Sequence, residues 1–271
     1  RTANWMDGLT MLLSGKNAII YGAGGSIGRR VAAAFVRDGA AVHLCGRNVH
    51  ALEAVSEEVQ AQGGRATVSS VDALDAGAVR ERANEIEAAA GPIDISFNLI
   101  GVEDDQGTEL TKMSKADFLR PIAIGTEAHF TTATEAARRM QARGSGVILA
   151  LTATPSRLAL PLVGGFGAYC CAIEGFYRGL AAEVGPAGVR VTWLRSAGSP
   201  ETFGDDVAVD EHGDQAGIAA SDYLEQMRAA TLLKRFPRAD EVANAAVLAA
   251  SDRASAITGS AVNVTCGQIV D

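Results

Sequence analysis

Short apolar runs alternate along the chain with longer stretches in which apolar residues recur every three or four positions. The short runs predict β-strands, and the longer stretches predict helices with one buried face. Strands are predicted at Asn17–Tyr21, Ala41–Cys45, Ala66–Ser69, Ile93–Phe97, Val147–Leu151, Val189–Leu194 and Ala261–Val264. Helices are predicted at Ile27–Arg37, Val49–Ala61, Ala76–Ala90, Ala116–Ala142 and Tyr169–Val184. Strands that alternate with helices of this length indicate βαβ units and a parallel sheet.

The composition of the chain argues against three classes of protein: disordered, membrane-spanning and nucleic-acid-binding proteins. With 48% hydrophobic residues the chain can form a core, which excludes a largely disordered protein. A membrane span is not expected, because no window of about 18 residues is free of charged or strongly polar groups. The formal net charge of −8 argues against a nucleic-acid partner, since binding to phosphates needs a positive field.

Cysteine and histidine spacing gives no metal site. Neither residue type forms a ligand pair, and no Gly-x-Ser-x-Gly turn is present, so metal binding and acyl transfer are not predicted. We expect four reduced cysteines: Cys45, Cys170, Cys171 and Cys266. Cys170 and Cys171 are expected to pack inertly, because nothing near them in the sequence would lower a thiol pKa beyond the start of a helix. The first dozen residues lack an apolar signal core, so we interpret 1–12 as an extension and expect a cytoplasmic protein.

The most informative segment follows the first predicted strand and opens the first predicted helix. Its spacing is G-x-x-G-x-x-G through Gly22, Gly25 and Gly28. Glycines there let the backbone approach a pyrophosphate, whose charge then meets the positive end of the helix dipole. The alternative is a tight turn that serves packing only. Cofactor contacts are predicted for Gly22, Gly24, Gly25, Ser26, Ile27 and Gly28.

The end of the second predicted strand bears on the choice of dinucleotide. An acidic residue there would hold the ribose 2′-hydroxyl of NAD, but this chain has Arg47 and no acid. A guanidinium suits the 2′-phosphate of NADP, so NADP is predicted and NAD stays the alternative. A solvent-facing Arg47 without a ligand is the other interpretation.

Several segments besides the glycine turn carry a family resemblance: Leu13–Lys16, Val71 and Asp72, Ile93–Gly101, Ala187–Val191, Pro200–Thr202 and the run from Ala239 to Gly259. Through them the chain resembles a short-chain dehydrogenase/reductase from about Leu13 to Asp271. The resemblance implies one domain over 13–271, a Rossmann-like doubly wound parallel sheet of about seven strands with helices on both faces. It further implies that Asp72, beside Ala73, holds the adenine, that Asn98 and Gly101 line the cofactor, and that Thr202 contacts the nicotinamide amide.

The catalytic positions of that family are largely replaced. The family has an Asn, a Ser, and a Tyr followed by a Lys four residues on, whereas this chain has Gly125, Ala153, Tyr169 and Ile173. Without the lysine charge, a tyrosine keeps a pKa near about 10, so on the order of one molecule in a thousand is phenolate at pH 7. Alcohol oxidation needs the phenolate, but carbonyl reduction needs the phenol. The sequence therefore favours reduction.

Two arginines are candidates to replace the lysine. Arg195 ends the sixth predicted strand and Arg157 follows the fifth, whereas Arg178 lies over two helical turns beyond Tyr169 and is too far away. A packing role for Tyr169 is the alternative to a catalytic one. The acidic, Gly-rich segment Ser196–Gln215 leaves a strand end and is predicted as a lid, or else as a solvated loop.

These observations predict an NADPH-dependent reductase of a small carbonyl compound, or in reverse a dehydrogenase of an alcohol. Tyr169 is the predicted proton donor, assisted by Thr152 or a neighbouring hydroxyl. The alternative is a non-catalytic nucleotide-binding or scaffold protein that kept the fold. The family resemblance implies a homodimer or homotetramer that packs through the helices at 116–142 and 169–184.

Overall fold

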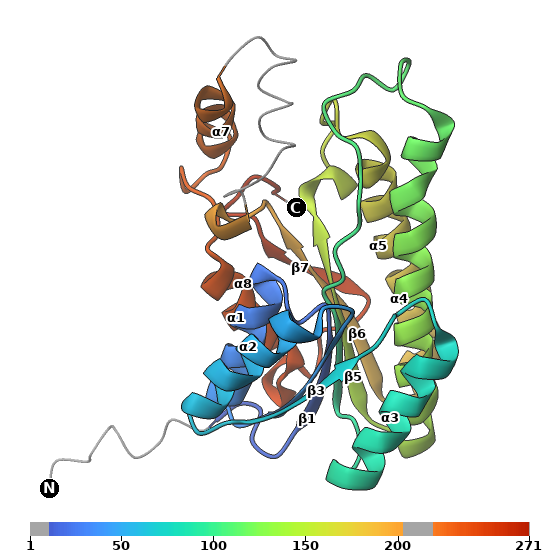
Figure 1. The fold of residues 1–271 in the computed structure, drawn as a ribbon. Helices are drawn as coiled ribbons and strands as arrows, with labels where there is room; N and C mark the ends of the chain where they lie inside the picture. Colours follow the sequence, from blue (N-terminus) through green and yellow to red (C-terminus); the bar gives the residue numbers. More distant parts are fainter. Residues whose placement is uncertain (1–10, 203–218, 271) are drawn as a thin grey trace, which may run out of the picture.

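The computed structural model describes residues 11–202 and 219–270 (Figure 1). Its centre is a seven-stranded parallel sheet in the order β3-β2-β1-β4-β5-β6-β7. The strands are β1 (Asn17–Tyr21), β2 (Ala41–Gly46), β3 (Arg65–Ser70), β4 (Ile95–Asn98), β5 (Gly146–Ala153), β6 (Val189–Ser196) and β7 (Ser260–Val264). Each lies where the apolar runs predicted a strand, so the predicted doubly wound α/β fold is confirmed.

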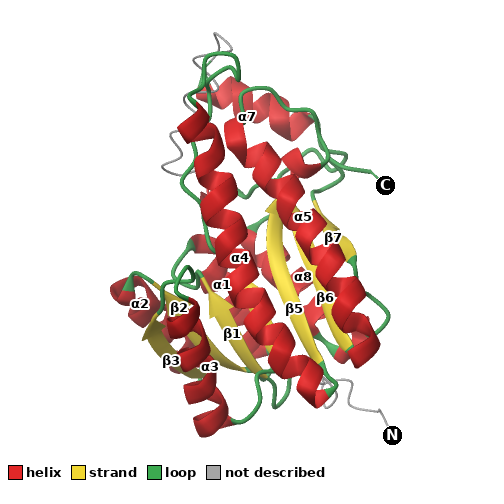
Figure 2. Ribbon diagram, turned by 90° about the vertical axis from the view of Figure 1, so that its right-hand side faces the viewer, coloured by secondary structure: helices red, strands yellow, loops and turns green. Residues whose placement is uncertain are grey.

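Helices cover both faces of the sheet, as Figures 1 and 2 show. One face carries α1 (Ser26–Arg37), α2 (Val49–Ala61) and α8 (Ala239–Ala250), and the other carries α3 (Ala76–Ala90), α4 (Lys115–Arg143) and α5 (Gly164–Val184). Successive strand residues point to opposite faces. In β1, Ile20 belongs to the first core and Ile19 to the second. Burial on both faces explains why the strands form near-continuous apolar runs.

Helix α5 begins five residues before the predicted start at Tyr169. Gly164 and Gly165 hide this first turn from a hydrophobic pattern, but both are needed for close packing. A methyl group on Gly165 would lie 2.0 Å from the carbonyl oxygen of Phe118 in α4, and one on Gly164 would lie 2.4 Å from the carbonyl oxygen of Asp105. The glycines therefore bring α5 against α4 and against the loop that follows β4.

The strand order reverses direction between β1 and β4. From β1 the chain moves outward to β2 and β3, then returns to β4 on the other side of β1. Ligands of open parallel sheets bind beyond the carboxyl ends of the strands at such a reversal. Of the predicted lid, Ser196 and the turn Pro200–Thr202 are described, whereas residues 203–215 lie outside the described residues.

Candidate functional site

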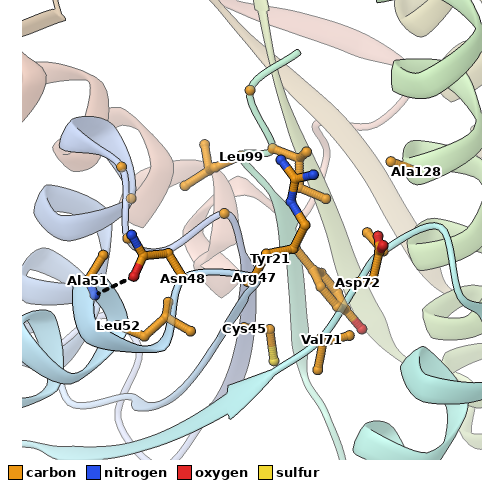
Figure 3. A pocket seen from close by; sticks show the side chains of 18 of the residues that line it. Tyr21, Cys45, Arg47, Asn48, Ala51, Leu52, Val71, Asp72, Leu99 and Ala128 are labelled. Carbon is orange, nitrogen blue, oxygen red and sulfur yellow. Dashed lines mark hydrogen bonds between the residues drawn. The ribbon is translucent and has the colours of Figure 1, made fainter. Parts of the chain in front are cut away.

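A cavity of about 750 Å³ opens at the reversal point of the sheet (Figure 3). The glycine turn after β1, the ends of β2 and β4 and the segment after β3 line it, together with Ile124 and Ala128 of α4. Of the predicted cofactor residues, all but Asn98 and Thr202 line this cavity: Gly22, Gly24, Gly25, Ser26, Ile27, Gly28, Arg47, Asp72, Ala73 and Gly101. Its size suits a small-molecule ligand.

The glycine turn leaves room for an anion because three of its positions have no space for a side chain. Gly22 has a φ of +78°, and a methyl group on it would lie 2.4 Å from the carbonyl oxygen of Leu99. A methyl group on Gly28 would lie 2.5 Å from the carbonyl oxygen of Gly22, and one on Gly24 would lie 2.9 Å from Ala51 Cβ. No side chain caps the start of α1, and its first residues, Ser26–Gly28, line the cavity. The start of this helix therefore fits a dinucleotide pyrophosphate.

Two charged side chains extend into the cavity from neighbouring strand ends. Figure 3 shows Arg47, which follows β2, and Asp72, which follows β3, among the side chains that line the cavity. Asp72 also accepts a hydrogen bond from the backbone N–H of Leu74, which fixes the turn after β3. Arg47 is exposed and forms no ion pair with any residue in 11–202 or 219–270. Its guanidinium charge is therefore available to a ligand.

Asn98 and Thr202 lie outside the cavity lining. The Asn98 amide is buried, donates to Thr132 Oγ1 at 2.9 Å and accepts from the Ile100 N–H at 3.0 Å. It therefore shapes the turn that carries Ile100 and Gly101 rather than facing the cavity. The Thr202 hydroxyl donates to the carbonyl oxygen of Ser199 at 2.6 Å, within the 3₁₀ turn η3 (Pro200–Thr202).

The Tyr169 side chain points into the space between α5 and α4. Its ring lies over Gly125, where a methyl group would come within 2.3 Å of the ring carbon Cε2. Its hydroxyl lies 3.0 Å from Nε2 of His129, one helical turn beyond Gly125, and His129 Nδ1 lies 3.0 Å from the Tyr177 hydroxyl. Ile124 and Ala128, each one residue earlier in α4, line the cavity. Tyr169 is not among the residues that line the cavity, but it packs against Gly125 and His129, the neighbours of these two lining residues.

The three hydrogen-bonded side chains, Tyr169, His129 and Tyr177, are all neutral at pH 7. Burial raises the pKa of Tyr169 and of Tyr177 well above the usual phenol value. Burial lowers the pKa of His129 to about 3, because an imidazolium ion would lose its hydration there. Tyr169 is therefore a phenol with its hydrogen in place. His129 could not be predicted as a site residue from the sequence, because its partners lie 40 and 48 residues away and no motif links them.

Thr152 belongs to a second buried polar group. Its hydroxyl donates to Glu174 Oε1 at 3.1 Å, and the Ser156 hydroxyl donates to the same oxygen at 2.6 Å. Arg195 binds the carboxylate with two hydrogen bonds, from Nη2 at 2.6 Å and from Nε at 2.8 Å. Burial pushes the pKa of Glu174 upward, but the hydrogen bonds from Arg195 and Ser156 outweigh it and lower that pKa. The carboxylate therefore stays ionised.

The catalytic lysine of the family has no cationic substitute in direct contact with Tyr169 among the described residues. Ile173 is fully buried at its position, and Arg195 is held by Glu174. Arg157 is exposed beyond the 3₁₀ turn η1 (Thr154–Ser156). Arg178 lies against the ring of Trp193. The two candidate substitutes from the sequence therefore do not contact the phenol.

Two buried cysteines, Cys45 at the cavity and Cys170 on α5, carry no reactive thiolate. Burial raises the pKa of Cys45 to about 11 and that of Cys170 to about 12, so both are thiols at pH 7. Across the described part of the chain, no three His, Cys, Asp or Glu side chains come together as metal ligands. No helix in these residues is long and apolar enough to cross a bilayer.

A parallel sheet in this order, with a glycine turn and an open cavity at its reversal point, is typical of dinucleotide-binding α/β proteins. Residues 22–268 match the sequence model of the family described as enoyl-(acyl carrier protein) reductase. D-threitol dehydrogenase of Mycolicibacterium smegmatis is 30% identical over 251 residues, 91% of this chain and 90% of that protein. The chain belongs to the short-chain dehydrogenase/reductase family of oxidoreductases.

Further proteins are similar to this chain in sequence or in fold. Gluconate 5-dehydrogenase of Gluconobacter oxydans is 28% identical over 94% of this chain and 95% of its own length. A crystal structure of gluconate 5-dehydrogenase from Burkholderia cenocepacia in complex with NADP and tartrate has a TM-score of 0.82 and 26% identity, over 96% of this chain and 97% of that one. An NAD⁺-bound xylitol dehydrogenase shares the fold, with a TM-score of 0.86 at 20% identity, over 93% and 98%.

Proposed function

We propose that the chain is an NADPH-dependent oxidoreductase that reduces the carbonyl group of a small molecule, with the Tyr169 hydroxyl as proton donor. The observation that carries the proposal is the cavity at the reversal point of the sheet. The glycine turn lines it, together with the residues that are predicted to hold the adenosine half of a dinucleotide: Arg47, Asp72 and Ala73. A bound NADPH would supply the hydride. Oxidation of an alcohol, the reverse reaction, is disfavoured because it needs Tyr169 as a phenolate.

The state of Tyr169 supports reduction. In reduction the substrate oxygen takes a proton from the enzyme, and the neutral phenol holds one. Oxidation would need the phenolate in the resting protein, whereas burial raises the pKa of Tyr169 and keeps it a phenol at pH 7. Thr152 gives its hydroxyl hydrogen to Glu174, so we assign it to the support of that carboxylate rather than to the substrate.

Arg47 supports NADP over NAD. Its exposed guanidinium lines the cavity, at the strand end where an NAD site carries an acid. By the family resemblance, Asp72 with Ala73 would hold the adenine, Asn98 would fix the loop at Gly101, and Thr202 would reach the nicotinamide amide. Among the structural relatives, one is complexed with NADP and another is bound to NAD⁺, so the fold accepts both.

We also propose that copies of the chain associate through α4 and α5. The two helices lie side by side on one face of the sheet (Figure 2), and Phe130 on α4 is 55% exposed. Its ring lies 6.0 Å from that of Phe176 on α5. An aromatic pair of this kind on a continuous two-helix surface suits the dimer or tetramer that the family resemblance implies.

A turnover assay tests the reaction. Purified protein is mixed with NADPH and a panel of small ketones, aldehydes and keto acids, and loss of NADPH absorbance is followed. Tyr169→Phe should lower kcat by about 100-fold or more and leave NADPH affinity within about twofold, because a proton donor contributes on that scale. Cys171→Ser, an exposed neighbour on α5, is the control and should keep full activity.

The second candidate is a nucleotide-binding protein without turnover. The orientation of the hydroxyls favours it: Tyr169 contacts His129 and Thr152 contacts Glu174. This candidate predicts NADPH binding with no reduction of any carbonyl in the panel. That result, or turnover that Tyr169→Phe leaves unchanged, would overturn the proposal that Tyr169 is the donor.

A further inference from the structure

Three rings form a buried hydrogen-bonded chain between α4 and α5. His129 sits between the two tyrosines, with its ring centroid 6.0 Å from that of Tyr169 and 5.5 Å from that of Tyr177. The exposed fractions are 4% for Tyr169, 1% for His129 and none for Tyr177. Each tyrosine hydroxyl has one hydrogen-bond partner among the residues of 11–202 and 219–270, and that partner is the imidazole.

The three rings carry more polar hydrogens than the two hydrogen bonds between them use. Each phenol carries one hydroxyl hydrogen and the neutral imidazole carries one N–H, which makes three donors for two contacts. If Nδ1 carries the hydrogen, Tyr169 donates to Nε2 and the Tyr177 hydrogen is left over. If Nε2 carries it, Tyr177 donates to Nδ1 and the Tyr169 hydrogen is left over.

Burial decides between these two arrangements. An unpaired hydroxyl hydrogen is costly where neither water nor an acceptor can reach it. Tyr177 is fully buried, and the Phe176 ring stands edge-on to it at 5.1 Å between centroids. Tyr169 is 4% exposed, and its ring packs on Gly125, next to the cavity-lining residue Ile124. The leftover hydrogen is therefore better tolerated on Tyr169.

We propose that His129 is a positioning residue: as the Nε2–H tautomer it donates to the Tyr169 oxygen, accepts from Tyr177, and leaves the Tyr169 hydroxyl hydrogen free for a substrate oxygen. The role in turnover rests on the proposed function above. When Tyr169 gives its proton to the carbonyl oxygen, the Nε2–H remains as a donor to the phenolate. The phenolate then recovers a proton from water after the product leaves.

The replaced family residues fit this arrangement. Any side chain at position 125 would occupy the place of the Tyr169 ring, because even a methyl group would lie 2.3 Å from it. A lysine in place of the buried Ile173 would add a charge to the apolar core on this face of the sheet. The glycine, the isoleucine and the histidine therefore form one consistent set, in which a neutral donor replaces a charged one.

Nitrogen-15 NMR of the histidine ring tests the tautomer without any turnover. The four histidines are labelled, and the His129 signals are assigned by their loss in His129→Gln. We expect a protonated Nε2 and an unprotonated Nδ1 in the wild-type protein, unchanged between pH 5 and 8, as the low pKa of His129 also requires. A protonated Nδ1 would overturn the proposal, whatever the enzyme does.

Variants of His129 test the effect of this side chain on turnover. His129→Gln keeps an amide N–H that can donate to Tyr169 and should retain more than about a tenth of wild-type kcat. His129→Phe keeps the ring volume without a donor and should lower kcat by about 100-fold, a loss in the range of general acid catalysis. Equal activity of the two variants, with both folded by circular dichroism, would contradict the positioning role.

Tyr177→Phe supplies the remaining arm. It removes the donor to Nδ1, so the imidazole should shift toward the Nδ1–H tautomer. Nε2 then accepts the hydroxyl hydrogen of Tyr169, so kcat should fall while KM for NADPH stays unchanged. The NMR spectrum of this variant reports that shift directly. An Nε2–H signal that persists in Tyr177→Phe would show that Tyr177 does not set the tautomer. Absence of all turnover with an Nε2–H tautomer would refute the proposed function and leave the assigned arrangement of hydrogens standing.

Discussion

A single missing side chain accounts for the position of Tyr169. By the family resemblance Gly125 stands where an asparagine is expected, which suggests a lost function. In the structure the same position gives the tyrosine ring its room, and His129 one turn further receives the hydroxyl. The replacement therefore has a structural consequence that the sequence comparison alone does not reveal.

Gly125→Ala tests this packing. The added methyl group would lie 2.3 Å from the Tyr169 ring and 2.9 Å from Val102 Cγ1, so the core must shift. We expect a loss of about 1–3 kcal/mol in the free energy of unfolding, the usual cost of overpacking. Urea denaturation measures it, as a lower midpoint at unchanged slope.

Gly175→Ala is the matched control on the neighbouring helix. A methyl group there meets no atom within 4 Å, so the greater helix propensity of alanine should raise stability by up to about 1 kcal/mol. If Gly125→Ala were as stable as Gly175→Ala, the ring could not lie over position 125 as described.

The elements of the fold could be predicted from the sequence, but the contacts between them could not. Strands buried on both faces produce apolar runs, which can be recognised in the sequence. The glycine turn after β1 indicates a phosphate-binding site, because it lies between a strand and a helix. The pairing of Glu174 with Arg195 joins residues 21 positions apart on α5 and β6, and no local pattern marks it. The chain through His129 was missed for the same reason.

Glu174→Gln tests the contribution of that ion pair to the packing of α5, β6 and the turn after β5. Both side chains are at most 4% exposed, so the variant leaves a buried, unpaired guanidinium. We expect a loss of about 3–5 kcal/mol at pH 7, measured by urea denaturation. Glu225→Gln, in the exposed pair with Arg228, should cost no more than about 1 kcal/mol.

The contribution of Glu174 to the free energy of unfolding should depend on pH in a direction that its lowered pKa sets. The pKa of Glu174 is lower in the folded chain than the value of about 4.3 expected when unfolded, so its contribution is complete above that value. It is lost as the pH falls through the lower, folded pKa. The stability difference between wild type and Glu174→Gln should therefore shrink in acid. A difference that stays constant down to pH 3 would contradict an ionised carboxylate.

At the scale of the whole molecule, the surface formed by α4 and α5 bears on assembly. Phe130→Glu places a charge on this surface without touching the cavity lining. If copies associate there, the variant should sediment as a smaller species than the wild type in analytical ultracentrifugation. Leu110→Glu, at a 63% exposed side chain in the loop before α4, is the control and should keep the wild-type mass. Equal masses of all three proteins would contradict the proposed interface.

The most direct test of the account is the affinity of the chain for the two reduced dinucleotides. Titration by fluorescence should give a Kd for NADPH at least about tenfold below that for NADH, because a charged hydrogen bond contributes about 1.5–3 kcal/mol. Arg47→Asp should invert the preference, since a carboxylate repels the 2′-phosphate and accepts from a 2′-hydroxyl. Equal Kd values for both dinucleotides in the wild type, or a preference that Arg47→Asp leaves unchanged, would contradict an NADPH-dependent enzyme.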